Sequence, residues 1–225
     1  MRDRVGVFED RPAAGAALAE MMQGLVPPDA LVLAVPAGGV PVGVALAERL
    51  GLELDVAAIS KITPPWNTEI GYGAVAFDGS VLLNQPLLEQ MGLDQHDVDR
   101  GTDLARQKVA RRLKQLRGED SPLRIEGRTV VLVDDGLATG FTILCGCEAL
   151  HRAKAGRIIL AVPTAHIGSL GRVADCFHTI YCPNTRSGGA FAVADAYRRW
   201  EDVSESQARR ALEQFRRTAP RPPGL

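Results

Sequence analysis

The sequence lacks a net charge of either sign. Its 225 residues include 26 lysines and arginines and 27 aspartates and glutamates, which give a formal net charge of -1 at pH 7. Attraction of a whole protein to nucleic acid or to an anionic membrane surface requires a marked excess of positive charge, so neither partner is favoured. Charged residues at 24% and hydrophobic residues at 46% are typical of a globular chain, and the length suits a single domain over residues 1–225.

Cysteine is scarce, and its spacing is not that of a metal centre. The four cysteines lie at positions 145, 147, 176 and 182, and this spacing does not match the paired motifs of common zinc sites. Cys145 and Cys147 are two residues apart on an expected helix and therefore point to different faces. We predict that all four are small buried hydrophobic residues of a protein in a reducing cytoplasm.

Long apolar runs are also missing, with one borderline stretch. Residues 30–47 carry no charge, which just reaches the length of a membrane helix, but they contain two prolines and three glycines. A strand, a glycine-rich loop and a helix account for this stretch better than a membrane span does. The first ten residues, MRDRVGVFED, lack the apolar core of a secretory signal. We therefore expect a cytoplasmic protein without a membrane anchor.

Expected strands alternate with expected helices along most of the chain. Apolar runs predict strands at 31–35, 55–60, 129–133, 157–162 and 179–182, and helical patterns fall at 10–24, 42–50, 94–117, 141–153 and 205–217. This alternation predicts an α/β fold with a mostly parallel central sheet flanked by helices. Asp78-Gly79, between two short apolar runs, predicts a β-hairpin. We assign residues 62–90 to a hairpin or hood insertion and residues 218–225 to a mobile tail.

Four candidate ligand elements fall at the carboxyl ends of the expected strands, where parallel sheets bind their ligands. They are residues 36–39, 60–61, 134–142 and 163–166. One cleft can therefore collect them, which would not be expected of unrelated surface loops.

The third of these elements is the most informative. Residues 130–142 read VVLVDDGLATGFT, in which a buried strand runs into Asp134 and Asp135 and a loop of small and hydroxyl residues then opens a helix. The helix start offers free N–H groups and the positive end of its dipole to a phosphate, and Thr139 and Thr142 add hydroxyl donors. The carboxylates can accept hydrogen bonds from ribose hydroxyls or face a hydrated metal ion. An ordinary turn with a capping residue needs only one Asp or Thr, so the segment predicts a sugar-phosphate site.

This segment resembles the 5-phosphoribosyl-1-pyrophosphate (PRPP) binding motif of the type I phosphoribosyltransferases, in which a hydrophobic run and two acidic residues precede Gly-x-Ala-Thr-Gly-x-Thr. The resemblance extends over roughly residues 30–200. It implies the type I phosphoribosyltransferase fold, with a hood over the strand ends, and a Mg²⁺-dependent pentosyltransferase of nucleotide metabolism. Such an enzyme transfers 5-phosphoribose from PRPP to a nitrogen acceptor, a nucleobase or a related heterocycle, and releases pyrophosphate.

The resemblance also implies which residues form the site. Asp134 and Asp135 would be the catalytic pair, orienting the ribose and holding Mg²⁺ through water. The implied substrate-binding residues are Ala37, Gly38, Gly39, Lys61, Ala138, Thr139, Gly140, Phe141 and Thr142. Residues 138–142 would hold the 5′-phosphate, while residues 37–39 resemble the family's pyrophosphate loop, whose glycines let backbone amides approach an anion. By itself a Gly-Gly pair is often a plain turn and a lysine at a strand end is usually solvated, so these two assignments depend on the main motif.

Two departures from the family pattern leave a second function open. The family's first loop often carries a basic residue where this chain has Ala37, and the subgroup of uncharacterised phosphoribosyltransferases often carries one where it has Ser60. Losing both cations would weaken PRPP binding or turnover, so a non-catalytic regulator that senses PRPP or nucleotides remains an alternative. A regulator would need a nucleic-acid surface, for which the basic helix at 94–117 is the candidate. Its acids come first and its bases last, which suits the helix dipole and predicts a solvated face.

The sequence does not predict the acceptor base, because its identity depends on pocket residues that differ among members of one fold. His166 is a candidate for the acceptor pocket, and Glu69 is either a solvated carboxylate or a catalytic base. Tyr197 and Trp200 could stack on a base, although core packing is the simpler interpretation. A homodimer is the default expectation for a small-molecule enzyme of this kind.

Overall fold

Five parallel strands form the central sheet, in the order β2-β1-β6-β7-β9. The structure is a computed structural model that describes residues 1–67, 70–117, 123–189 and 191–218. The five strands are β1 (Leu31–Ala34), β2 (Glu53–Val56), β6 (Thr129–Val133), β7 (Arg157–Ala161) and β9 (Thr179–Tyr181). β6 lies in the middle and pairs with β1, where Leu31 is opposite Val130, and with β7. The predicted mostly parallel sheet is therefore confirmed.

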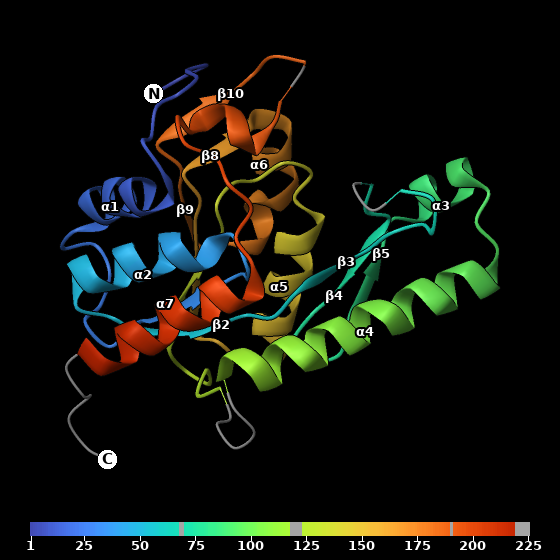
Figure 1. Cartoon of the computed structure of the whole chain (residues 1–225), viewed down its shortest axis with the longest axis horizontal. Coiled ribbons are helices and arrows are strands. Elements are labelled where there is room, and N and C mark those ends of the chain that lie inside the picture. The colour runs from blue at the N-terminus through green and yellow to red at the C-terminus, as the bar shows by residue number, and fades with distance from the viewer. Residues whose placement is uncertain (68–69, 118–122, 190, 219–225) are drawn as a thin grey trace.

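Helices cover both faces of this sheet, which explains why β1 is buried along its whole length. On one face lie α1 (Arg11–Met22), α2 (Gly39–Leu50) and α7 (Glu205–Thr218), and on the other lies α5 (Phe141–Arg152), as Figure 1 shows. Alternate residues of β1 serve the two layers, because Val32 packs with the first group of helices and Leu33 packs with α5. The two hydrophobic layers hold the strand ends rigidly in place.

The helix predicted at 42–50 begins three residues earlier, at Gly39. Pro41 looks like part of a loop in the sequence, but it occupies the first turn of α2, where its missing N–H costs no helical hydrogen bond. The predicted stop is confirmed, since Gly51 adopts the left-handed conformation with φ 66°. The loop after β1 is therefore short and delivers the chain directly into a helix.

The strand predicted at 55–60 is in fact two strands in different sheets. β2 ends at Val56, and β3 (Ser60–Ile62) pairs with β4 (Gly73–Val75), which in turn pairs with β5 (Val81–Leu83), both pairs being antiparallel. The intervening residues 57–59 are all apolar and buried, so the sequence carries no sign of the change of sheet. The hairpin predicted at Asp78-Gly79 is present, with Gly79 at φ 83°.

The hairpin is followed by two helices, α3 (Gln85–Met91) and the long α4 (Gln95–Arg117), which extend to one side of the sheet in Figure 1. α4 packs on the hairpin through Val98, Ala105 and Val109, around the fully buried Tyr72. The assignment of residues 62–90 to a hood within one domain stays a prediction. Of the tail predicted at 218–225, only Thr218 is among the described residues. Glu69 also lies outside the described residues.

A small layer covers the carboxyl ends of the strands. Residues 163–166, a candidate ligand element in the sequence, include strand β8 (Thr164–His166), which pairs in parallel with β10 (Asn184–Arg186). α6 (Ile167–Val173), η1 (Ala174–Cys176) and η2 (Val193–Ala196) complete it. The chain start joins this layer, since the amino group of Met1 donates to the carbonyl of Pro183 at 2.5 Å. No helix within the described ranges is both long enough and apolar enough to cross a membrane.

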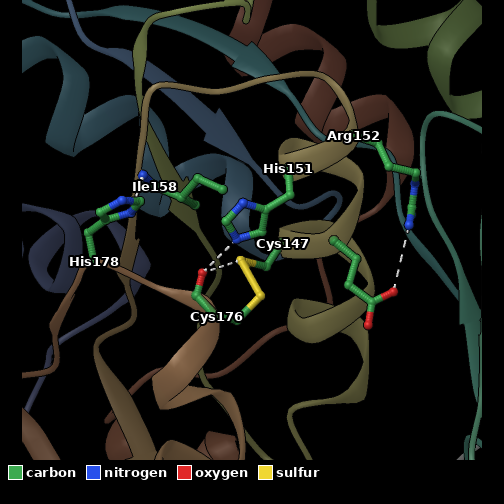
Figure 2. Close-up of a disulfide and its surroundings, with 7 residues drawn as sticks. Cys147, His151, Arg152, Ile158, Cys176 and His178 are labelled. Carbon is green, nitrogen blue, oxygen red and sulfur yellow. Dashed lines mark hydrogen bonds and ion pairs between the residues drawn. A yellow bond between two sulfur atoms is a disulfide. The ribbon is translucent and has the colours of Figure 1, made fainter.

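The cysteine prediction is wrong for two of the four residues. Cys147 of α5 and Cys176 of η1 form a disulfide, shown in Figure 2, although 29 positions separate them. Cys145 points the opposite way, as predicted, and its Sγ lies 3.4 Å from the carbonyl oxygen of Ala74. His151 lies close to the two bonded sulfurs, but thiols joined to each other are not available as metal ligands. The disulfide therefore links α5 to the covering layer.

Reduction of this disulfide is expected to lower the free energy of unfolding. In the chain-entropy model, a loop closed across 29 positions corresponds to about 3.6 kcal/mol. Cys147→Ser should show the same loss without reductant and no further loss with it, whereas Cys182→Ser should leave the response to reductant intact. Urea denaturation with and without reductant measures this. A wild-type midpoint that does not move when the thiols are shown to be reduced would contradict the expectation.

Candidate active site

Asp134 and Asp135 stand at the carboxyl end of β6, in the centre of the sheet edge. The strand delivers them there because its four preceding apolar residues are fully buried between the helical layers. Asp134 Oδ1 accepts a hydrogen bond from the backbone N–H of Asp135 at 2.8 Å. Burial raises the pKa of the Asp134 carboxyl well above its ordinary value, and the neighbouring Asp135 charge raises it further.

Asp135 has a charged partner that the sequence did not reveal. Arg11 of α1 donates from Nε to Asp135 Oδ2 at 2.9 Å, and only 8% of the Arg11 side chain and 17% of the Asp135 side chain are exposed. Burial raises the pKa of Asp135, and the Arg11 charge opposes this rise. Arg11 also donates to the carbonyl of Glu201 at 2.7 Å. Asp135 is thus fixed in place by the first helix of the chain.

Two aromatic residues complete this support. The Arg11 guanidinium lies 3.9 Å from the ring centroid of Trp200, which indicates a cation–π contact. Tyr197 donates from its hydroxyl to the carbonyl of Asp135 at 2.6 Å, and it is 5% exposed. The interpretation of Tyr197 as a core residue is confirmed. Trp200 is 36% exposed, and it contacts both Arg11 and the Tyr197 ring, whose centroid lies 5.2 Å from its own.

The loop after β1 passes directly against the two carboxylates. A Cβ atom at Gly38 would overlap the Asp135 carboxylate, and one at Gly39 would lie 2.9 Å from the carbonyl oxygen of Val133. Gly38 has φ -60°, so the glycine is required here by close approach and not by an unusual backbone angle. Ala37 and Gly38 are half-buried and Gly39 is buried.

The β6–α5 loop, residues 134–140, turns the chain into α5 at a left-handed glycine. Gly140 is the N-cap, with φ 84°, a conformation in which other residues are strained. The first amide N–H groups of α5 have no partner inside the helix and point along its axis toward the sheet edge. Ala138 and Thr139 are exposed, and Phe141 and Thr142 are half-buried. This arrangement suits a bound anion.

The covering layer, which consists of β8, β10, α6, η1 and η2, is hydrogen-bonded to the β6–α5 loop through α6. Ser169 of α6 donates from its hydroxyl to the carbonyl of Ala138, and Arg172 donates to the carbonyl of Thr139. The Arg172 guanidinium also lies 5.8 Å from the Phe141 ring centroid. Arg172 places a positive charge beside the loop, and no sequence motif had singled it out.

A cavity of about 360 Å³ opens between this loop and α4. Its walls come from the ends of β1 and β6, from β3, and from α4, and the lining residues are Val35, Pro36, Ile59, Ser60, Lys61, Thr63, Gly101, Leu104, Ala105, Lys108, Arg112, Asp134 and Thr142. Of the residues predicted for the site, it brings together Lys61, Asp134 and Thr142. The others lie at the same sheet edge but outside this lining, and they are Ala37, Gly38, Gly39, Asp135, Ala138, Thr139, Gly140 and Phe141. His166 is not among the lining residues either.

The prediction of a solvated basic face on α4 is correct only in part. Arg106 is solvated, because 53% of its side chain is exposed and it pairs with Asp103 at 3.3 Å. Lys108 is exposed as well, although it borders the cavity, whereas Arg112 is half-buried in the cavity wall. Arg112 is held there by two hydrogen bonds, from Nε to the Glu205 carboxylate at 2.9 Å and from Nη1 to the carbonyl of Ile59 at 3.1 Å.

The chain is similar to known proteins over most of its length. A family model described as "Phosphoribosyl transferase domain" matches residues 6–196. Proteins of two Mycobacterium tuberculosis strains, each named as a presumed phosphoribosyl transferase, are 31% identical over 201 residues, which are 89% of this chain and 45% of theirs. This chain thus spans about half the length of those relatives. The crystal structure of TT1426 from Thermus thermophilus is 30% identical with a TM-score of 0.71, covering 92% of this chain and 98% of that chain.

Proposed function

Because this chain belongs to the phosphoribosyl transferase family, we propose that it is a Mg²⁺-dependent enzyme that transfers 5-phosphoribose from PRPP to a nitrogen atom of a heterocyclic acceptor. The observation that carries the proposal is the placement of Asp134 and Thr142 on the wall of one cavity, at the carboxyl edge of the sheet. The carboxylate suits the ribose hydroxyls, and the start of α5 suits the 5′-phosphate. The two recognition elements are adjacent, as they must be for a single sugar phosphate.

The donor set at the end of β6 also fits a magnesium ion. Carboxylate oxygens are the ligands that Mg²⁺ prefers, and Asp134 borders the cavity while Arg11 neutralises Asp135. Asp134 would therefore hold the hydrated ion, and Asp135 would keep Asp134 and the neighbouring backbone in position. When bound, the ion would neutralise charge on the pyrophosphate leaving group.

The remaining chemistry falls to the protein's own groups. The Asp134 carboxylate would fix the ribose by accepting from its hydroxyls, and the N–H groups of α5 would anchor the phosphate end. The ring then gains positive charge as the bond to pyrophosphate breaks, and a nearby carboxylate stabilises that charge. The apolar wall of Val35, Ile59 and Leu104 would limit the entry of water that would otherwise hydrolyse PRPP.

The direct test is a screen of purified protein against nucleobases and related heterocycles with PRPP and Mg²⁺, with pyrophosphate release as the readout. We expect release that depends on one acceptor class and disappears in Asp134→Asn. A regulator would instead show no turnover with any acceptor and would retain a DNA or RNA fragment with a steep salt dependence. The placement of Arg112 supports the enzyme, because this cation is half-buried and bound to Glu205, and so is withdrawn from the outer face that a nucleic acid would contact.

Binding of a nucleoside monophosphate is expected to fall when Thr139 or Thr142 becomes alanine. Each hydroxyl can donate a charge-assisted hydrogen bond to the phosphate, worth roughly 1.5–3 kcal/mol. Titration calorimetry measures the change. Thr129→Ala, at the opposite end of β6, is the matched control and should bind like the wild type. Undiminished binding in both loop variants would remove the phosphate from this loop.

A further inference from the structure

We propose that Lys108 of α4 binds the pyrophosphate group of PRPP in the cavity beside Asp134, and so supplies the positive charge that the first loop lacks at Ala37. The inference rests on the proposed function, because it concerns the same substrate. It makes α4 part of the binding site, where the sequence predicted a helix with a solvated basic face.

The elements that line the cavity indicate where the pyrophosphate group would lie. Asp134 and Thr142, where the proposed function places the ribose and its phosphate, form one part of the cavity wall, and residues of α4 form another. The end of β1, through Val35 and Pro36, forms part of the wall between them. A group attached to the ribose therefore extends along the end of β1 toward α4. This is the direction in which the first loop was expected to meet the pyrophosphate.

The charged residues on the cavity walls favour an anionic ligand. Three cationic residues line the cavity, Lys61, Lys108 and Arg112, and among the described lining residues Asp134 is the single carboxylate. A neutral heterocycle would gain nothing from three cations gathered on one side. A group with several negative charges would be stabilised by them, because the cavity wall also excludes part of the solvent.

Lys108 is the cation of the three that is available to a ligand. Arg112 is already bound to Glu205 and to the backbone of Ile59. Among the residues that the structure describes, Lys108 has neither an ion pair nor a hydrogen bond. Burial and the positive charges of Arg112, Arg111 and Lys61 lower the pKa of Lys108, while Glu205 opposes this. An anion that binds beside Lys108 would reduce the repulsion between this unpaired cation and its positive neighbours.

The experiment compares two probes on four proteins. Titration calorimetry with inorganic pyrophosphate and with ribose 5-phosphate, each with Mg²⁺, is run on the wild type, Lys108→Ala, Lys108→Arg and Arg106→Ala. Arg106→Ala is the matched control, because it removes one positive charge from the same helix at a solvated position. We expect Lys108→Ala to raise the Kd for pyrophosphate about tenfold and to leave the Kd for ribose 5-phosphate unchanged. Lys108→Arg should retain most of the affinity.

The outcomes separate this inference from the proposed function. If Lys108→Ala binds pyrophosphate as tightly as the wild type, or if Arg106→Ala weakens it equally, Lys108 does not contact the group. If the wild type binds ribose 5-phosphate but not pyrophosphate, the cavity assignment is wrong while the phosphate site stands. If the wild type binds neither probe, the proposed function itself fails. Thermal denaturation checks that each variant is folded.

Discussion

Replacing Arg11 with alanine is expected to destabilise the protein by about 3 to 5 kcal/mol, because it leaves a carboxylate buried without its partner. The ion pair between Arg11 Nε and Asp135 Oδ2 is 2.9 Å long and nearly closed to solvent. The same change removes the bond to the carbonyl of Glu201 and the stacking on Trp200. Urea denaturation at neutral pH measures the loss.

A double-mutant cycle shows whether the pair itself is responsible. Asp135→Asn alone should cost less than Arg11→Ala, because burial already opposes the charged form of Asp135. The double variant should be more stable than the sum of the two losses predicts, since neither charge is then left unpaired. Arg199→Ala is the control, as this arginine is 66% exposed and pairs with Asp10 at the surface, where about 0.5 kcal/mol is expected. Additive losses would contradict the coupling.

Asp134→Asn is expected to lower turnover and, at the same time, to raise the stability of the ligand-free protein. Turnover should fall on the order of 100-fold, because the group that faces the ribose and the developing positive charge loses its own charge. The ligand-free protein should become more stable by roughly 0.5–2 kcal/mol, because the change removes a carboxylate whose charge is disfavoured by burial and by Asp135. The asparagine keeps an oxygen that can accept from the N–H of Asp135, so the local backbone is not disturbed.

The gain in stability should depend on pH in a defined direction. The pKa of Asp134 is raised in the folded protein above its ordinary value of 3.8, so the folded state binds this proton more tightly than the unfolded chain does. The stability of the wild type therefore falls as pH rises from the ordinary pKa toward the raised one. The advantage of Asp134→Asn should be small near about pH 4 and larger near about pH 7. Melting temperatures that differ equally at both values would argue against a buried charge.

The central sheet and the β6–α5 loop could be predicted because their signals are local. Four apolar residues before Asp134 match a buried strand, and a left-handed turn such as that at Gly140 favours glycine. The hairpin at Asp78-Gly79 was predictable for the same reason. The change of sheet between β2 and β3 was not, because apolar residues 57–59 continue without interruption and the sequence does not show which neighbour they pair with.

The parts of the site that the sequence missed all depend on distant partners. Arg11 lies 124 positions from Asp135, and in the sequence it is an ordinary arginine in a first helical turn. Lys108 is one of several basic residues on α4, and only the packing of the helix over the sheet edge distinguishes it from Arg106. The Cys147–Cys176 disulfide likewise appears only when α5 and η1 are placed side by side.

The two hydrogen bonds from α6 to the β6–α5 loop affect which kind of ligand the loop can bind. Ser169 and Arg172 each donate to one carbonyl oxygen of the loop, those of Ala138 and Thr139, so each oxygen has one lone pair fewer to offer a ligand. The amide hydrogens at the start of α5 have no such competitor within the helix. Beyond the carboxylates of Asp134 and Asp135, the part of the loop that leads into α5 therefore offers mainly hydrogen-bond donors. A phosphate, rich in oxygen acceptors, matches this surface, whereas an ammonium group, which has donors only, is disfavoured.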